Sequence, residues 1–284
     1  MIVSMILPTR IIDFHVHLFP DRMLDAIRKY FSSGYKWDVI YQMYAPECIR
    51  YLSERGVVKI VYSNYAHRAG VAEELNHWNR EMLNLHPDIY CFAPFHPDDA
   101  RCMEIAERAL SHPRVLGFKL QLLVQRFYPH DERLFPLYDL VMECGKRILF
   151  HVGTGPVGNE FVGLEQFRKL LDRYPDLPAN VAHMGAYEYQ GFMDLLNEHP
   201  ALYMDTSFSF FREFQGKGGF NLGSEVLEQH KGRILYGSDF PNLILPRESE
   251  LETLLAYNLS HDCYDRIFYQ NGAELIDHLT KAGR

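Results

Sequence analysis

The chain has 284 residues, of which 47% are hydrophobic and 23% are charged, so its composition is that of an ordinary globular protein. Its formal net charge is −8, from 29 Lys and Arg against 37 Asp and Glu. An acidic chain without a basic run is a poor candidate for binding nucleic acid. The five cysteines form no CxxC pair, which argues against a disulfide framework or a thiolate zinc site and favours reduced thiols in the cytoplasm.

The first ten residues are apolar but too short to span a membrane. They also lack the basic start and the small-residue cleavage site of a signal peptide. We therefore expect an N-terminal extension that leads into the first strand, and no association with a membrane.

Eight short apolar runs recur along the chain, and each is rich in β-branched and aromatic residues. Their continuous hydrophobicity is typical of strands that are buried on both faces of a parallel sheet. The runs cover residues 10–16, 57–63, 89–95, 115–121, 147–153, 178–184, 202–208 and 233–239.

Segments with helical spacing separate these runs. In residues 70–87, for example, an apolar stripe of Val71, Leu75, Trp78, Met82 and Leu85 is followed by a proline. Eight strand-then-helix units predict one domain over residues 1–284, a single closed (β/α)8 barrel of the α/β class, which needs about 250 residues. A doubly wound sheet is the alternative, although it usually has fewer strands.

The C-terminal part of the chain should complete the barrel with two helices. One barrel helix is expected over about residues 248–257. A final helix, about residues 262–281, is expected to pack outside the barrel.

Histidine and aspartate stand at the ends of several of these buried runs. They are His15 and His17 at the end of the first run, His151 in the fifth, His183 in the sixth and Asp239 in the eighth. In a barrel these strand ends converge on one mouth, where active sites lie. A single histidine in such a place is more often structural, but four histidines and one aspartate at equivalent positions indicate a common site.

The spacing of the first two histidines favours a shared ligand. Alternate residues of a strand point to the same side, so His15 and His17 should both face the barrel interior. With His151 and Asp239 they make a set of three imidazoles and one carboxylate, which suits one divalent metal, zinc or alternatively manganese, with a position left open for water.

The motifs around these residues resemble those of the amidohydrolase superfamily. Within it, the chain is similar to the amidohydrolase-related branch that includes aminocarboxymuconate semialdehyde decarboxylase and resorcylate-type decarboxylases. The segments that carry the resemblance are IIDFHVHLFP (11–20), GFKLQ (117–121), LFHVGTG (149–155), VAHMG (181–185), YMDTS (203–207), YGSDFP (236–241) and NGAELI (271–276).

The resemblance implies a role for each strand-end residue. His15, His17, His151 and Asp239 match the metal ligands, and Asp239 is also the proton acceptor for the attacking water. His183 polarises or protonates the substrate in single-metal members and is a ligand in two-metal members.

Two-metal members also bridge their ions with a carboxylated lysine at the position of Lys119. One metal is the preferred interpretation, with Lys119 either contacting substrate or pairing with a carboxylate at the barrel mouth. Gln121 stands where the branch often has a histidine.

These features predict a hydrolase that activates water for attack on an amide, ester or lactone carbon of a small, carboxylated substrate. The alternatives are a metal-dependent, non-oxidative decarboxylase of a small aromatic or unsaturated acid, and an inactive barrel that acts as a binding protein. The expected partner is a small molecule, and a homodimer is left open.

Loops after the strands should bind the substrate. The candidates are Lys119, Gln121, Arg126, His67, His96 and Asn242. An arginine there would suit a carboxylate, although a solvated surface role is the alternative for each. An aromatic segment with Tyr35 and Trp37 is either a lid over the mouth or part of the packing.

Overall fold

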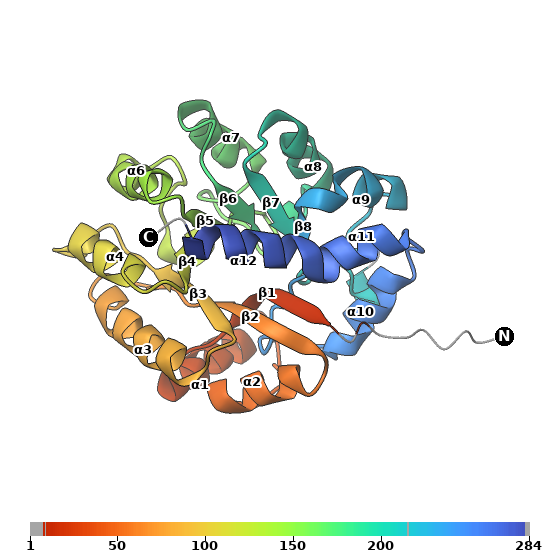
Figure 1. The fold of residues 1–284 in the computed structure, drawn as a ribbon, viewed down its shortest axis with the longest axis horizontal. Coiled ribbons are helices and arrows are strands. Elements are labelled where there is room, and N and C mark those ends of the chain that lie inside the picture. Colours follow the sequence, from red (N-terminus) through yellow and green to blue (C-terminus); the bar gives the residue numbers. More distant parts are fainter. Residues whose placement is uncertain (1–7, 9, 215, 282–284) are drawn as a thin grey trace.

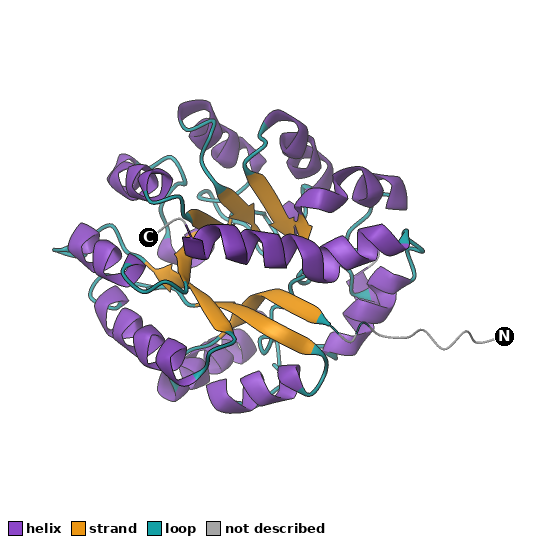
Figure 2. Ribbon diagram, in the orientation of Figure 1, coloured by secondary structure: helices purple, strands orange, loops and turns teal. Residues whose placement is uncertain are grey.

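The computed structural model describes residues 8, 10–214 and 216–281, and most of the expected N-terminal extension lies outside the described residues. Eight parallel strands follow one another around the sheet in chain order and alternate with helices (Figures 1 and 2). The strands are β1 (Ile11–His17), β2 (Val57–Ser63), β3 (Ile89–Pro94), β4 (Val115–Gln121), β5 (Arg147–His151), β6 (Ala179–Val181), β7 (Leu202–Asp205) and β8 (Ile234–Leu235).

The first strand also contacts the chain around the last one, which closes the sheet into a barrel. The amide of Phe14 donates to the carbonyl of Tyr236 at 2.8 Å, and the amide of Asp239 donates to the carbonyl of His15 at 2.8 Å. The predicted (β/α)8 barrel is therefore confirmed.

Strands β2 and β4 have the predicted bounds, whereas the last three strands are shorter than the apolar runs that predict them. They contain 3, 4 and 2 residues. Beyond each of them the chain enters a turn in which His183, Phe208 and Asp239 have φ values of 57°, 60° and 62°. A strand cannot accommodate this left-handed backbone, so the hydrophobicity of the runs overstates their extended length.

The helices surround the sheet (Figure 2). They are α1 (Asp21–Tyr30), α2 (Ala45–Ser53), α3 (Ala72–Leu85), α4 (Cys102–Leu110), α5 (Leu122–Gln125), α6 (Phe135–Glu143), α7 (Leu164–Arg173), α8 (Tyr189–Glu198), α9 (Ser224–His230), α10 (Arg247–Leu255), α11 (His261–Asp265) and α12 (Asn271–Lys281). Shorter helical turns are η1 (Phe31–Tyr35), η2 (Glu132–Leu134), η3 (Ala182–Gly185), η4 (Arg212–Phe214), η5 (Lys231–Arg233) and η6 (Arg266–Gln270). In α3 the predicted stripe buries Leu75 and Met82, but Leu85, in the last position, is 72% exposed.

The C-terminal segment is helical without a break over residues 261–281, close to the expected 262–281, but it differs from the expectation in where it packs. It consists of α11, η6 and α12, and α12 crosses one end of the barrel (Figure 1). Leu275, Ile276 and Leu279 of α12 belong to a buried cluster with side chains from β1 to β5 and β8. Gly272 permits this approach, because a Cβ there would lie 3.2 Å from the Cβ of Ile12. The apolar face of α12 therefore closes the barrel, which is why this helix is so strongly amphipathic.

Among the described residues, no helix has both the length and the apolar character needed to cross a membrane.

Candidate metal centre and pocket

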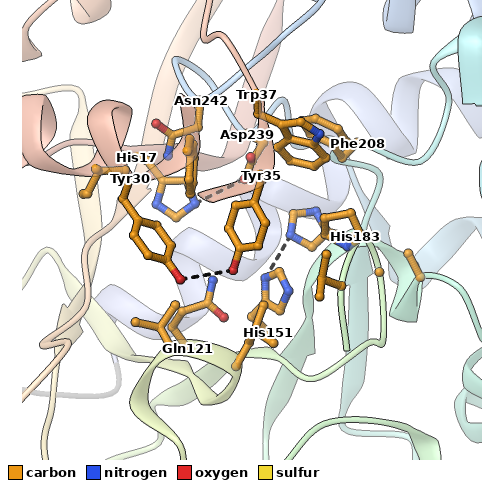
Figure 3. A pocket seen from close by; sticks show the side chains of 18 of the residues that line it. His17, Tyr30, Tyr35, Trp37, Gln121, His151, His183, Phe208, Asp239 and Asn242 are labelled. Carbon is orange, nitrogen blue, oxygen red and sulfur yellow. Dashed lines mark hydrogen bonds and ion pairs between the residues drawn. The ribbon is translucent and has the colours of Figure 1, made fainter. Parts of the chain in front are cut away.

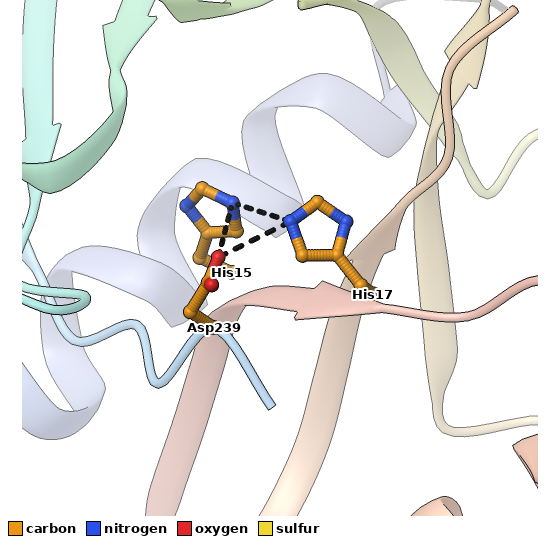
Figure 4. A group of neighbouring side chains, drawn as sticks. All are labelled: His15, His17 and Asp239. Carbon is orange, nitrogen blue, oxygen red and sulfur yellow. Dashed lines mark hydrogen bonds and ion pairs between the residues drawn. The ribbon is translucent and has the colours of Figure 1, made fainter. Parts of the chain in front are cut away.

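His15, His17 and Asp239 lie together at the C-terminal mouth of the barrel (Figure 4). The Nε2 atoms of the two histidines are 3.3 Å apart. Asp239 Oδ1 lies 3.4 Å from His15 Nε2 and 3.1 Å from His17 Nε2. Three candidate ligand atoms, from β1 and from the turn after β8, thus converge on one point.

An irregularity in β1 aims the two histidines at the mouth. The pairing register of β1 with β2 shifts between Asp13 and Val16. Within this irregular stretch, Phe14 packs in the cluster under α12, whereas the next residue, His15, faces the site together with His17. A bulge changes which residues face the interior, so apolar and ligand side chains can follow one another on the same strand.

Gly237 lets the turn that carries Asp239 approach β1. A Cβ at this position would lie 2.6 Å from the Cβ of His15 and 3.3 Å from the Cβ of Asp205. The glycine of the YGSD segment is therefore required by the closeness of the backbone to a candidate ligand.

His151 and His183 form a second pair beside this group. His151 Nδ1 lies 3.2 Å from His183 Nε2, and the His183 ring stacks on His15 with centroids 5.1 Å apart. His151 lies outside the tight group of His15, His17 and Asp239. Its Nε2 atom is buried and makes no hydrogen bond to any described residue. His151 is thus adjacent to the group and has a free nitrogen.

Asp205, at the end of β7, positions residues of both groups, a role that the sequence analysis did not assign. Its Oδ2 accepts from His15 Nδ1 at 2.8 Å, while its Oδ1 accepts from the backbone amides of His183 at 3.1 Å and Ser207 at 3.2 Å. The side chain is fully buried. The available signal was the YMDTS segment, which places this aspartate inside one of the predicted apolar runs.

The pKa of Asp205 supports this role. Burial alone would raise this pKa, but the nearby His15 and His183 and the hydrogen bond from His15 lower it well below its ordinary value. Asp205 is therefore an ionised acceptor.

Hydrogen bonds determine which nitrogen of His15 and His17 carries the proton. His15 Nδ1 faces the Asp205 carboxylate, and His17 Nδ1 lies 3.3 Å from the carbonyl oxygen of Ser63. Carboxylate and carbonyl oxygens only accept, so each Nδ1 carries the proton. The Nε2 lone pairs of His15 and His17 therefore face one another and Asp239.

The same reasoning applies to His183 and His151. His183 Nδ1 lies 3.0 Å from the carbonyl oxygen of Ser207 and so carries the proton, which makes His183 Nε2 the acceptor from His151 Nδ1. This leaves a lone pair on His151 Nε2. Burial lowers the pKa of His183 and holds the pKa of His151 well below its ordinary range, so both imidazoles are neutral near pH 7.

A divalent cation fits this arrangement. Burial lowers the pKa of His15 to about 4, so no proton separates its Nε2 from that of His17. Asp239 Oδ1 is buried and accepts no hydrogen bond from the described residues. Lone pairs at such distances repel one another unless a cation lies between them. Neutral imidazoles with a carboxylate are ligands for zinc and manganese.

A pocket of about 510 Å³ opens above this group (Figure 3). His17, His151, His183 and Asp239 form part of its surface, and the rest is mainly apolar. Its aromatic lining residues are Phe19, Tyr30, Phe31, Tyr35, Trp37, Tyr65, Tyr187, Tyr189, Phe208 and Phe214. The expected aromatic segment after β1 therefore contributes Tyr35 and Trp37 directly to the pocket.

Three of the candidate substrate-binding residues line this pocket, namely His67, Gln121 and Asn242. The side-chain oxygens of Gln121 and Asn242 are buried without a hydrogen-bond partner among the described residues. Both terminal amides are thus available to a bound molecule.

Lys119, His96 and Arg126 are not among the residues that line the pocket. Lys119 is fully buried in the barrel, where burial lowers its pKa to about 8 despite the nearby Asp205 and Asp239. His96 packs against Phe127 with ring centroids 6.0 Å apart. The expectation that these three side chains meet substrate is therefore not supported by their positions.

Arg126 shows why the sequence alone does not predict where a loop side chain points. It follows the short helix α5 with a left-handed φ of 60°. This backbone directs its side chain to the surface, where it is 71% exposed and lies 3.9 Å from Glu160. The alternative of a solvated surface residue therefore describes Arg126.

The family model of the amidohydrolases matches residues 12–277, nearly the whole described chain. The chain belongs to the amidohydrolase family. The resemblance inferred from the motifs is confirmed. No curated protein matches this amidohydrolase.

Solved structures with the same fold come from several bacteria. An uncharacterised TIM-barrel protein of Bordetella bronchiseptica has a TM-score of 0.70 and 18% identity, covering 97% of this chain and 100% of its own. A protein of Pseudomonas putida, provisionally named a 2-pyrone-4,6-dicarboxylic acid hydrolase, has a TM-score of 0.65 and 18% identity, covering 96% and 99%. The 5-carboxyvanillate decarboxylase of Novosphingobium aromaticivorans, in complex with manganese and a nitrobenzoic acid ligand, has a TM-score of 0.64 and 14% identity, covering 94% and 96%. At these identities the likeness shows the fold, which is shared by a protein provisionally named a hydrolase and by a decarboxylase.

Proposed function

We propose that this amidohydrolase is a metal-dependent hydrolase that cleaves an amide, ester or lactone bond of a small substrate. The observation that carries the proposal is the convergence of Nε2 of His15 and His17 with Oδ1 of Asp239 at the floor of the pocket. His151, with its free buried Nε2, is the proposed fourth ligand. Zinc is the proposed ion and manganese the alternative.

A bound divalent ion supplies a Lewis acid, which lowers the pKa of water and polarises a carbonyl group. The residues of the chain supply the rest. Asp239 lies both beside the ligand nitrogens and on the pocket wall, so its carboxylate can take the proton of the attacking water.

His183 is the second group proposed to transfer a proton. Its Nδ1 is held by the carbonyl of Ser207, which leaves Nε2 directed at the pocket beside His151. A proton gained at Nε2 can be donated to the oxyanion or to the leaving group. His183 thus acts on the substrate, and His151 on the ion.

Decarboxylation is the second candidate, and the apolar pocket favours it. A carboxylate that leaves water for apolar surroundings is destabilised, and its loss as CO2 removes the charge. The manganese complex of the 5-carboxyvanillate decarboxylase gives this alternative a precedent on the same fold.

Two measurements test the proposed function. Elemental analysis of the purified protein should find close to one divalent ion per chain, and chelation should abolish turnover, whereas a barrel that only binds ligands would need neither. A panel of esters, amides, lactones and aromatic acids, scored for released acid and for released CO2, should give acid. Release of CO2 alone would establish the decarboxylase, and no ion after zinc or manganese supplementation would refute both reactions.

Asp205→Asn should weaken metal binding by roughly 10–100-fold, the usual effect of removing the partner that orients a histidine ligand. The asparagine keeps the size of the side chain but loses the charge that holds the proton on His15 Nδ1. Competition with a chromophoric chelator measures the affinity. Asp277→Asn is the matched control, because Asp277 is exposed and pairs with Lys281 at the surface, and the affinity of this variant should equal that of the wild type. Equal affinity in Asp205→Asn would contradict the assigned role.

A further inference from the structure

Three stacked rings form one side of the pocket, which we call the aromatic wall: Trp37, Phe208 and Phe214. The ring centroids of Trp37 and Phe208 are 5.5 Å apart with planes at 11°, and those of Phe208 and Phe214 are 5.7 Å apart with planes at 16°. Phe208 also meets His183 nearly edge-on, with centroids 6.5 Å apart (Figure 3). A continuous aromatic surface therefore runs from the proposed proton donor, His183, across Phe208 to Trp37 and Phe214.

The two halves of this wall come from distant parts of the chain. Trp37 follows η1 after the first strand, whereas Phe208 and Phe214 follow β7. The left-handed φ of 60° at Phe208 turns its ring into the stack. Two separate segments have thus been brought to one face of the pocket.

Positive side chains are missing from this surface. No lysine or arginine is among the residues that line the pocket in the described part of the chain. The cationic side chains nearby do not reach it: Lys119 is fully buried, with no hydrogen-bond partner for its Nζ among the described residues, and does not line the pocket. Arg126 lies near Glu160 at the surface, and Arg247 is buried with its Nε 4.0 Å from Asp13 Oδ2. A substrate carboxylate that packs against the aromatic wall, away from the proposed ion, would therefore lose its hydration without meeting a cationic side chain.

The polar groups that remain suit an uncharged substrate. The amide side chains of Gln121 and Asn242 and the ring of His67 can form neutral hydrogen bonds. The cavity volume of about 510 Å³ lies within the usual range for small-molecule sites and accommodates one or two aromatic rings.

We propose, building on the proposed function, that the substrate is an uncharged aromatic acyl compound: an aryl amide, ester or lactone with no free carboxylate. Its ring packs on the aromatic wall, and its carbonyl group points to His183 and Asp239. This assignment departs from the carboxylated substrate that the loop arginines suggested in the sequence.

Binding to the metal-free protein tests the substrate class without any turnover. Trp37 and Trp78 are the two tryptophans of the chain, and Trp78 packs edge-on against Tyr62, away from the pocket. In a Trp78→Phe background, fluorescence therefore reports on the wall alone, and ligand-observed NMR gives an independent affinity. The probes are benzamide, benzoate, which has the same ring with one charge, and cyclohexanecarboxamide, which is neutral but not aromatic.

We expect benzamide to bind at least roughly tenfold more tightly than benzoate, because the carboxylate meets no cation. It should also bind more tightly than cyclohexanecarboxamide. Phe208→Leu should weaken benzamide binding roughly two- to tenfold by removing one aromatic partner. Leu123→Arg, which adds a cation to the lining, should reverse the preference toward benzoate. The proposal would be overturned if the protein with Phe208 and Leu123 unchanged bound benzoate as tightly as benzamide, or more tightly. Equal affinities for benzamide and cyclohexanecarboxamide would also overturn it.

The outcomes separate this proposal from the proposed function. Selective benzamide binding by a protein that neither retains a metal nor hydrolyses the panel would support the aromatic, uncharged site and refute the hydrolase. Hydrolysis restricted to aliphatic or carboxylated substrates would support the hydrolase and refute the aromatic, uncharged site.

Discussion

His183→Asn should leave the metal ion in place and lower turnover by on the order of 10²–10⁴-fold, as expected for the loss of a proton-transfer group. The group of His15, His17 and Asp239 is complete without His183. Its Nε2 instead faces His151 and the pocket. Turnover and metal content, measured on the same preparation, check this prediction.

His67→Asn is the matched control, since it makes the same substitution at a histidine that lines the same pocket but lies outside the ligand group. It should keep the metal and lose less turnover than His183→Asn, because His67 can hydrogen-bond to a substrate but has no proposed part in proton transfer. His183, His15 and Asp205 also form a second possible ligand group. If His183→Asn emptied the site, or if two ions were found bridged through Lys119, a two-metal arrangement would replace the single-metal one.

His151→Asn and Asp239→Asn should each leave the purified protein with little or no metal and no measurable turnover. In His151→Asn the ion loses the only described imidazole of the site whose Nε2 is buried and unpartnered. In Asp239→Asn it loses the negative charge that lies within 3.4 Å of both His15 and His17 nitrogens. These losses should exceed that of His183→Asn, because the Lewis acid itself is missing.

Thermal unfolding provides a readout that does not depend on activity. An ion present at 100 times its Kd stabilises the folded protein by about 2.7 kcal/mol, so added zinc should raise the Tm of the wild type. The same addition should not raise the Tm of His151→Asn, whereas His67→Asn should respond like the wild type. A zinc response of His151→Asn equal to that of the wild type would remove His151 from the ligand set.

The strands and the core of the site were predictable because both depend on local pattern. Continuous apolar runs mark buried parallel strands, and His15, His17, His183 and Asp239 stand where such runs end. The shortness of β6 to β8 was not predicted, since each predicted run continues into the mostly buried, left-handed turn that ends the strand.

Contacts between the side chains of distant segments also could not be predicted from the sequence. Asp205 is separated from His15 by 190 residues, and only the closed barrel brings their side chains to 2.8 Å. Arg126 was misplaced because its direction depends on one backbone φ angle after α5. Position along a strand could be inferred, whereas the direction of a loop side chain could not.

The position of α12 has a consequence for how the protein is made. Residues 271–281 cover the end of a barrel whose first strand begins at Ile11, so a segment that leaves the ribosome early and one that leaves it much later are neighbours in the finished fold. Until α12 emerges, Ile12 and Phe14 lack the apolar surface that covers them. Contacts so distant in sequence are slow to form, and a growing chain exposes this surface throughout its synthesis. Nascent chains of this protein are therefore expected to need a chaperone until α12 has been made. A chain stalled on the ribosome before α12 should hold a barrel with one end uncovered.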